Sequence, residues 1–340
     1  MRTLLCIHRR AGAGHDEGVA SRMATYLEGL LRGQHEVSWS LADDHAEVAR
    51  LAREFVLANE GPVLVLGGGG SGTARAVIEG VLAADASAGR ARVAFLRLGS
   101  GNLLARQYGV PKEVTAALDG IAANVLLGAT APCTVMRCEM TDLEGVTSIR
   151  HAASLIGLGE LGRIPADLKA IKARRWHAAL GRMVGIENRT RIDYLAFSVR
   201  RLAGAMLHTA RFSSTRIEVN GRRRRMRLLA GAVMNFPVAE MPLPASVTVE
   251  EPRLTVHLLP RPRGRLSELL RLVRGGLGRL VQTEHIEAWQ TLSLQFAGAH
   301  GGTVFLDEDT LPRLRTFAVR PVQGLRVVPG PGYRFERKEQ

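Results

Sequence analysis

Cysteine, aromatic residues and long apolar runs are all scarce in this sequence. Its 340 residues include three cysteines, Cys6, Cys133 and Cys138, which are too few for a disulfide scaffold and fit a reducing compartment. No apolar run approaches the roughly 18 residues that a membrane-spanning helix needs. The apolar stretch at the N-terminus is too short for a signal peptide. We therefore expect a cytoplasmic protein, with peripheral association with a membrane as a further option.

Lysine is also scarce, because only four of the 46 basic residues are Lys. An arginine-rich genome explains that bias, but not the distribution of charge along the chain. Residues 1–130 carry 13 basic and 13 acidic side chains, so the whole net charge of +14 belongs to the remainder. This excess predicts an anionic partner for the second part, either a membrane surface or nucleic acid. Aromatic residues make up only 5%, so platforms for base stacking are few and we expect no nucleic acid.

The first 130 residues alternate between patterns typical of strands and of helices. Strands are predicted at residues 3–8, 36–40, 62–66 and 92–98, and helices at 17–31, 46–57 and 73–84. This order predicts a parallel sheet with helices on both faces, a Rossmann-like three-layer α/β domain over residues 1–130.

Residues 131–340 have a different texture, in which short strands are joined by Gly, Pro and Asn turns. Strands are predicted at 133–140, 147–158, 216–219, 227–234, 253–259, 291–296, 303–306 and 325–328, and helices at 166–184, 193–207 and 265–280. We expect a β-rich, antiparallel, sandwich-like domain, with about the last 20 residues packing back on the first domain. The amphipathic stretch 266–280 is rich in Arg, so a core helix and a membrane-surface helix both stay open.

The most informative stretch is the strand at 62–66, which leads into a glycine turn at Gly67–Gly72 and then into a helix. Glycines let backbone N–H groups approach a ligand, and the helix points its positive end at the same place, so together they form a phosphate cradle. The turn matches G-x-G-x-x-G, but no acidic residue ends the next strand, and no Lys-Ser/Thr pair of the Walker pattern follows. A tight turn without a ligand is the alternative.

A second small-residue turn, Leu98–Asn102, follows the next strand. Because ligands of such sheets bind at the carboxyl ends of the strands, the two turns are expected to face each other across a nucleotide cleft.

These two turns carry a resemblance to a family. Gly69-Gly70-Ser71-Gly72-Thr73 resembles the G-G-D-G-T motif, and Arg97–Arg106 resembles P-x-G-T-G-N-D/L-x-A-R. Both motifs are those of the diacylglycerol kinase-like lipid kinases, whose superfamily also includes sphingosine, ceramide and NAD kinases. The second motif favours lipid kinases over NAD kinases, which lack it.

The resemblance implies transfer of the γ-phosphate of ATP, with Mg²⁺, to a hydroxyl of a diacylglycerol- or sphingoid-type lipid. The nucleotide-binding residues would be Gly69, Gly70, Ser71, Gly72, Thr73, Gly99, Ser100, Gly101 and Asn102. The turn Asp307-Glu308-Asp309 resembles the family's D-G-E motif, which makes Asp307 and Asp309 the catalytic candidates. Arg222, Arg223, Arg224 and Arg225 are candidates for contact with the lipid or the membrane. A solvated acidic turn and a solvated hairpin tip are the alternatives for these two segments.

The sequence also departs from the family pattern. Ser71 stands where the family has Asp, and Glu308 stands where it has Gly. These changes support a second hypothesis, a catalytically impaired relative that binds nucleotide or lipid for regulation. Edge strands in the second domain leave a homodimer open.

Overall fold

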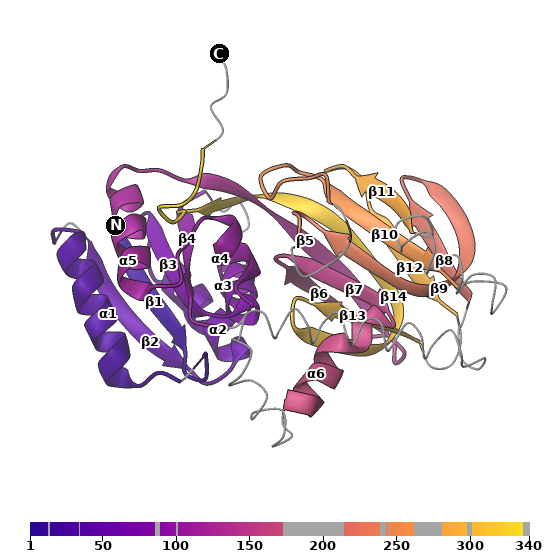
Figure 1. Ribbon diagram of the computed structural model, residues 1–340, viewed down its shortest axis with the longest axis horizontal. Coiled ribbons are helices and arrows are strands. Elements are labelled where there is room, and N and C mark those ends of the chain that lie inside the picture. The colour runs from indigo at the N-terminus through magenta and orange to yellow at the C-terminus, as the bar shows by residue number, and fades with distance from the viewer. Residues whose placement is uncertain are drawn as a thin grey trace, which may run out of the picture. The chain divides into compact units, whose positions relative to one another are not determined.

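The computed structural model describes residues 1–12, 14–33, 35–85, 89–99, 101–172, 214–238, 243, 245–261, 281–297 and 301–335. The chain divides into two compact units (Figure 1). Unit 1 comprises residues 1–134 and 323–340, and unit 2 comprises residues 135–322. The predicted helices at 193–207 and 265–280 lie outside the described residues, as do residues 173–184 of a third. Within the described residues, no helix combines the length and the apolar character needed to cross a membrane.

Unit 1 is an α/β structure, as the sequence predicts. Its elements are β1 (Arg2–His8), α1 (Glu17–Leu30), β2 (Glu36–Ala42), α2 (His45–Leu57), β3 (Val63–Gly69), α3 (Ser71–Ala84), β4 (Ala91–Arg97), α4 (Leu103–Gln107) and α5 (Val114–Leu126). Acidic side chains begin three of the helices: Asp16, Asp44 and Glu113 accept hydrogen bonds from first-turn amides of α1, α2 and α5. These caps satisfy donors that have no partner inside a helix.

The strands of unit 1 pair in parallel, in the order β2-β1-β3-β4 (Figure 1). Beyond β4, Arg326 and Val327 of β14 (Asp309–Val327) add a further parallel pairing. The chain order reverses between β1 and β3, and in open parallel sheets ligands bind outside the carboxyl ends of the strands at such a point. The topology therefore predicts a ligand site at the loops that follow β1 and β3.

Unit 2 is β-rich and its pairings are antiparallel, which confirms the coarse prediction. Besides β14 its elements are β5 (Ala131–Asp142), β6 (Thr147–Ala152), β7 (Leu155–Gly159), a 3₁₀ turn (Leu161–Arg163), α6 (Ile164–Lys172), β8 (Ser214–Val219), β9 (Arg222–Met234), β10 (Leu254–Pro260), β11 (Gln282–Ile286), β12 (Leu292–Phe296) and β13 (Gly302–Leu306). The single strand predicted at 147–158 is in fact two, β6 and β7, because the chain bends at Ala153 and Ser154.

The sandwich-like arrangement predicted for unit 2 is wrong, because the hydrogen-bonded strands form a closed circuit. The path runs β8-β9-β7-β13-β14-β12 and returns to β8. Two long strands make the closure possible, since β9 and β14 change partners along their length. β9 pairs through Arg222–Arg227 with β8 and through Ala230–Met234 with β7. Each of the six strands in the circuit therefore has a partner on both sides, whereas β6 and β11, outside it, each pair with one described strand.

One apolar core fills unit 2. Its buried side chains come from every strand of the closed circuit and from β5, β10 and β11. Along β8 the pattern alternates, with Ile217 and Val219 buried and Arg216 exposed. This two-residue period fixes which face of each strand looks into the core.

Candidate functional site

The predicted glycine turn at 67–72 is wrong in extent, because β3 continues through Gly69 and α3 begins at Ser71. Only Gly70 lies between them. Glycine backbones keep their ladder hydrogen bonds, so Gly67, Gly68 and Gly69 pair in register with β4. Because these glycines have no side chains, side chains of neighbouring elements pack directly against the strand backbone. A Cβ on Gly67 would lie 2.9 Å from Val77 Cγ2.

The two glycine turns lie beside each other at the carboxyl ends of neighbouring strands, but their backbones are in direct contact, so the cleft predicted between them is absent from the part of the chain that the structure describes. The Gly99 N–H donates to the carbonyl of Gly69 at 3.0 Å. A Cβ on Gly99 would lie 2.4 Å from the Cα of Gly70, so no larger residue fits without displacing the β3–α3 turn. The glycine at 99 is therefore needed for contact between backbones.

Asn102 holds the second turn in place. Its backbone is left-handed with φ of 52°, and its side-chain oxygen accepts from the Gly99 N–H at 3.3 Å. Its amide nitrogen donates to the Gly99 carbonyl. Ser71 joins this turn to α3, because its Oγ accepts from the Leu103 N–H at 3.4 Å. Ser71 thus stabilises the start of α4. Gly101 lies beside Asn102, and Ser100 lies outside the described residues.

The amino end of α3 carries no side-chain cap. Gly70 precedes the helix and has no side chain to cap it, and no side-chain capping bond is present there. The amides of Ser71, Gly72 and Thr73 belong to the first turn, where an α-helix offers them no acceptor. These donors and the positive end of the helix dipole fit a phosphate group. The residues present therefore suit the phosphates of a nucleotide.

The loops after β1 and β2 reach the same place. Gly12 has φ of +60°, and a Cβ there would lie 2.4 Å from the Leu98 carbonyl oxygen. On the other side, a Cβ on Gly72 would lie 2.3 Å from His45 Cε1. An ion pair of 2.9 Å between Arg9 and Asp43 links the two loops. Hence loops from all four strands converge on the β3–α3 turn.

His8 and His45 lie beside the candidate site, and the sequence reasoning did not single them out. Their rings lie with centroids 5.1 Å apart, and His45 contacts the first turn of α3. Burial lowers the pKa of His8 below 6.5, and Arg10 adds to this effect while Asp44 and Asp43 oppose it. The available signal was positional, since His8 ends β1 and His45 follows β2.

A protein site for Mg²⁺ does not emerge from the described residues. They contain no group of three His, Cys, Asp or Glu side chains that could hold a metal ion. The carboxylate that the family motif would supply is replaced by Ser71. We therefore assign no protein ligand to the metal and derive no step through it.

The two acidic candidates have different surroundings. Asp307 is 5% exposed and its carboxylate accepts from the amides of Ala153, Ser154 and Leu155 at 2.7, 2.8 and 3.2 Å. The Ser154 hydroxyl donates to it as well. With this many donors, the side chain of Asp307 fixes the bend between β6 and β7. Asp309 is 40% exposed and lies 3.8 Å from Arg150.

The four consecutive arginines do not form a hairpin tip. The turn is Asn220-Gly221, and Arg222–Arg225 follow it within β9. Because side chains alternate along a strand, the four are divided between two faces. Arg222 and Arg224 lie opposite the buried Val219 and Ile217, whereas Arg223 and Arg225 lie opposite Glu218 and Arg216.

Arg223 and Arg225 line a shallow groove of about 610 Å³ on the outer face of β8, β9, β12 and β14. Its floor consists of small side chains such as Ser293 and Ala318. Arg223 pairs with Glu218 at 2.7 Å, and Arg216 donates to Gln295 at 3.0 Å. Arg224 also lines the groove, which therefore carries four guanidiniums and one carboxylate.

Comparison with known proteins agrees with the motifs. Residues 2–136 match the family model of the diacylglycerol kinase catalytic domain, which confirms the resemblance predicted from the sequence. No curated protein matches the chain. Two solved structures assigned as diacylglycerol kinases from Bacillus anthracis str. Sterne resemble it with a TM-score of 0.64 and 14% identity, covering 97% of this chain and 98% or 97% of theirs. A third, from the same organism, has a TM-score of 0.62, 16% identity and 98% coverage of both chains. At these identities the likeness shows a shared fold.

Proposed function

We propose that the protein transfers the γ-phosphate of ATP to a hydroxyl of a diacylglycerol- or sphingoid-type lipid, because residues 2–136 match the model of the diacylglycerol kinase catalytic domain. The observation that carries the proposal is the direct contact of the two glycine turns beside the uncapped end of α3. For unit 1 we infer a Rossmann-like three-layer arrangement with the nucleotide at the carboxyl edge of the sheet.

In the proposed reaction, backbone amides at Ser71, Gly72 and Thr73 hold the phosphates, and the turn at Gly99–Asn102 contacts the rest of the nucleotide. Phosphoryl transfer depends mainly on positioning and on charge neutralisation. The lipid oxygen forms a bond to the γ-phosphorus while the bond to the leaving ADP oxygen breaks. The hydroxyl proton passes to a carboxylate, for which we propose Asp309, because Asp307 is occupied by backbone donors. ATP arrives with Mg²⁺.

The lipid is proposed to be reached at a membrane surface. Arg223 and Arg225 on the outer groove would contact anionic headgroups, since guanidinium groups bind phosphate oxygens in pairs. We propose a cytoplasmic protein that associates with the membrane from one side.

The test is incubation with ATP, Mg²⁺ and vesicles that carry diacylglycerol, ceramide or sphingosine in turn. A phosphorylated lipid that depends on ATP and on the protein supports the proposal. Absence of product over the whole panel, with ATP binding shown by calorimetry, counts against kinase activity and favours the second candidate.

That second candidate is a kinase-like protein that binds nucleotide or lipid without turnover. The observation in its favour is Ser71, which stands at the position where the family motif has a carboxylate. Its hydroxyl accepts a hydrogen bond at the start of α4 instead. The substitution Ser71→Asp distinguishes the active kinase from the impaired one, because it restores the family's carboxylate. The helix dipole favours an acidic side chain in the first turn, so the variant should fold. A large gain in lipid phosphorylation supports an impaired protein. Turnover by the unchanged protein at a rate that Ser71→Asp does not raise excludes it.

A further inference from the structure

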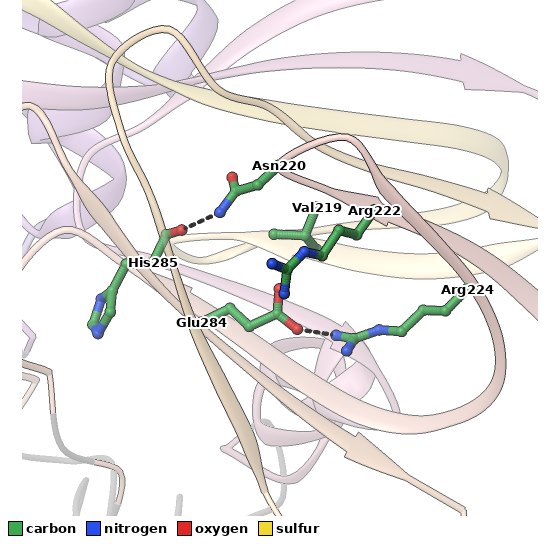
Figure 2. A pocket seen from close by; sticks show the side chains of 6 residues that line it. All are labelled: Val219, Asn220, Arg222, Arg224, Glu284 and His285. Atoms are coloured by element: carbon green, nitrogen blue, oxygen red, sulfur yellow. Dashed lines mark hydrogen bonds and ion pairs between the residues drawn. The ribbon is translucent and has the colours of Figure 1, made fainter.

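Unit 2 contains a cavity of about 450 Å³ whose lining is mostly polar, although it lies beside the apolar core. Its lining consists of Val219, Asn220, Arg222, Arg224, Glu284 and His285. Five of these six residues are polar or charged, and none is an aromatic of the Phe, Tyr or Trp type. We call it the Arg–Glu cavity (Figure 2).

The register of the strands shows that three of these side chains occupy core-facing positions. Arg222 lies opposite Val219 and Arg224 lies opposite Ile217, and both partners belong to the apolar core. Side chains directly opposite each other in an antiparallel pair share a face.

The wall formed by β11 also has a charged side chain at a core-facing position. Glu284 of β11 lies opposite Val256 of β10, whose side chain is fully buried in the core. Arg222 is nevertheless exposed, and Arg224 and Glu284 are partly exposed, so water and a polar ligand can reach all three charges.

The charges in the cavity do not balance. Arg224 forms an ion pair with Glu284, and these side chains are 35% and 27% exposed. Figure 2 shows the Arg222 guanidinium pointing toward the same carboxylate. Two guanidiniums thus face one carboxylate, which leaves a positive charge beside the empty volume. The carbonyl of His285 accepts from the Asn220 side chain at 3.0 Å and ties the wall of β11 to the β8–β9 turn.

We propose that the Arg–Glu cavity binds a phosphate group, held by Arg222 and Arg224, and that Glu284 competes with it. Guanidinium groups match the oxygens of phosphate in the way they match those of a carboxylate. The polar lining suits a headgroup or a soluble phosphate ester and not an acyl chain. This inference does not rest on the proposed kinase activity, since binding is measured without ATP.

If Glu284 competes with phosphate, removing its charge should raise the affinity for phosphate. In Glu284→Gln the side chain keeps its size but no longer neutralises a guanidinium. Phosphate should then bind about tenfold more tightly than to the unchanged protein, because a competing charge is gone. Arg222→Ala should weaken binding by a similar factor. The double variant Arg53→Ala/Lys112→Ala removes two exposed charges from unit 1 and should leave soluble phosphate binding unchanged.

The experiment titrates the full chain and each variant with inorganic phosphate and with glycerol phosphate by calorimetry. A parallel arm sediments them with phosphatidylcholine vesicles containing phosphatidylglycerol. Ordering of the affinities as Glu284→Gln above the unchanged protein above Arg222→Ala supports the cavity. That order in the first arm indicates a soluble phosphate, and in the second arm alone a lipid headgroup. If folded Glu284→Gln, verified by circular dichroism, binds no better than the unchanged protein in either arm, Glu284 is only a structural partner and the proposal is overturned.

Discussion

In the candidate site two backbones come close together at Gly99 and Gly70. A methyl group at position 99 would clash with the backbone of Gly70, because its carbon would lie 2.4 Å from the Gly70 Cα and 2.7 Å from the Gly70 nitrogen. The turn carrying the first-turn amides of α3 must then shift. At the residue scale, the site therefore depends on the absence of side chains.

We predict that Gly99→Ala weakens ATP binding at least tenfold and lowers the free energy of unfolding by about 1–3 kcal/mol, the usual cost of overpacking. Calorimetry with MgATP and thermal unfolding measure the two effects. Gly29→Ala is the matched control, because nothing lies within 4 Å of a Cβ at Gly29 in α1. In a helix this change should be neutral or stabilising. Unchanged ATP affinity in Gly99→Ala would show that the turn contact is not part of a nucleotide site.

His8 gives unit 1 a pH dependence. Its pKa is lowered in the folded protein, mainly by burial, so the folded state binds fewer protons at this side chain than the unfolded state. The stability it contributes is complete above the unfolded pKa near 6.5 and is lost as the pH falls below it. Lowering the pH therefore favours the unfolded state.

We predict that the loss of unfolding free energy between pH 7.5 and pH 5.5 is smaller in His8→Gln than in the unchanged protein. Urea denaturation at both pH values measures it. His35→Gln is a useful comparison, because burial also lowers the pKa of His35. Equal losses in His8→Gln and the unchanged protein contradict the assignment to His8.

At the scale of elements, the acidic turn between β13 and β14 separates a structural carboxylate from a catalytic candidate. Asp307 has φ of 55° and holds the amides at the β6–β7 bend, whereas Asp309 begins β14 with a half-exposed side chain. Neutralising Asp307 weakens several charge-assisted hydrogen bonds at once, while the ion pair of Asp309 with Arg150 is exposed and contributes little.

We predict that Asp307→Asn lowers the free energy of unfolding by about 2–3 kcal/mol and that Asp309→Asn changes it by less than about 0.5 kcal/mol. Under the proposed function, Asp309→Asn should also abolish lipid phosphorylation while leaving ATP binding intact. Chemical denaturation and the vesicle assay give the two readings for each variant. Full turnover in Asp309→Asn removes it as the base.

The elements themselves were largely predictable from sequence periodicity. In unit 1 the apolar patterns at 3–8 and 17–31 give β1 and α1 within a residue or two. The elements that were missed are α4, α5, β11 and most of β14, and two of them show the physical reason. α5 is apolar on nearly every side, so it shows little periodicity, and β11 is short and polar because Glu284 takes a core-facing position.

The site was predictable only in part. The glycine motifs located the β3–α3 and β4–α4 turns, because their spacing reflects backbone geometry. The histidines His8 and His45 were not found, since they come from different loops and no local pattern links them. The division of Arg222–Arg225 between two faces required the strand register, which a run of four identical residues conceals.

At the scale of the whole molecule, charge is distributed unevenly, since residues 1–130 carry no net charge and the remainder carries +14. An anionic membrane attracts each nearby Lys or Arg by about 1 kcal/mol within a Debye length. Two outward arginines of unit 2, Arg223 and Arg225, should therefore contribute more to membrane association than equal charges on unit 1.

We predict that Arg223→Glu/Arg225→Glu reduces sedimentation with phosphatidylglycerol vesicles by tenfold or more, because two attractive charges become repulsive. Arg53→Glu/Lys112→Glu lowers the net charge by the same amount at exposed positions of unit 1 and should have a much smaller effect. For the unchanged protein, binding should fall as NaCl is raised from about 0.05 to 0.5 M, since salt shortens the screening length. Equal losses in the two double variants would mean that only the net charge matters, and that the outer groove of unit 2 is no preferred membrane contact.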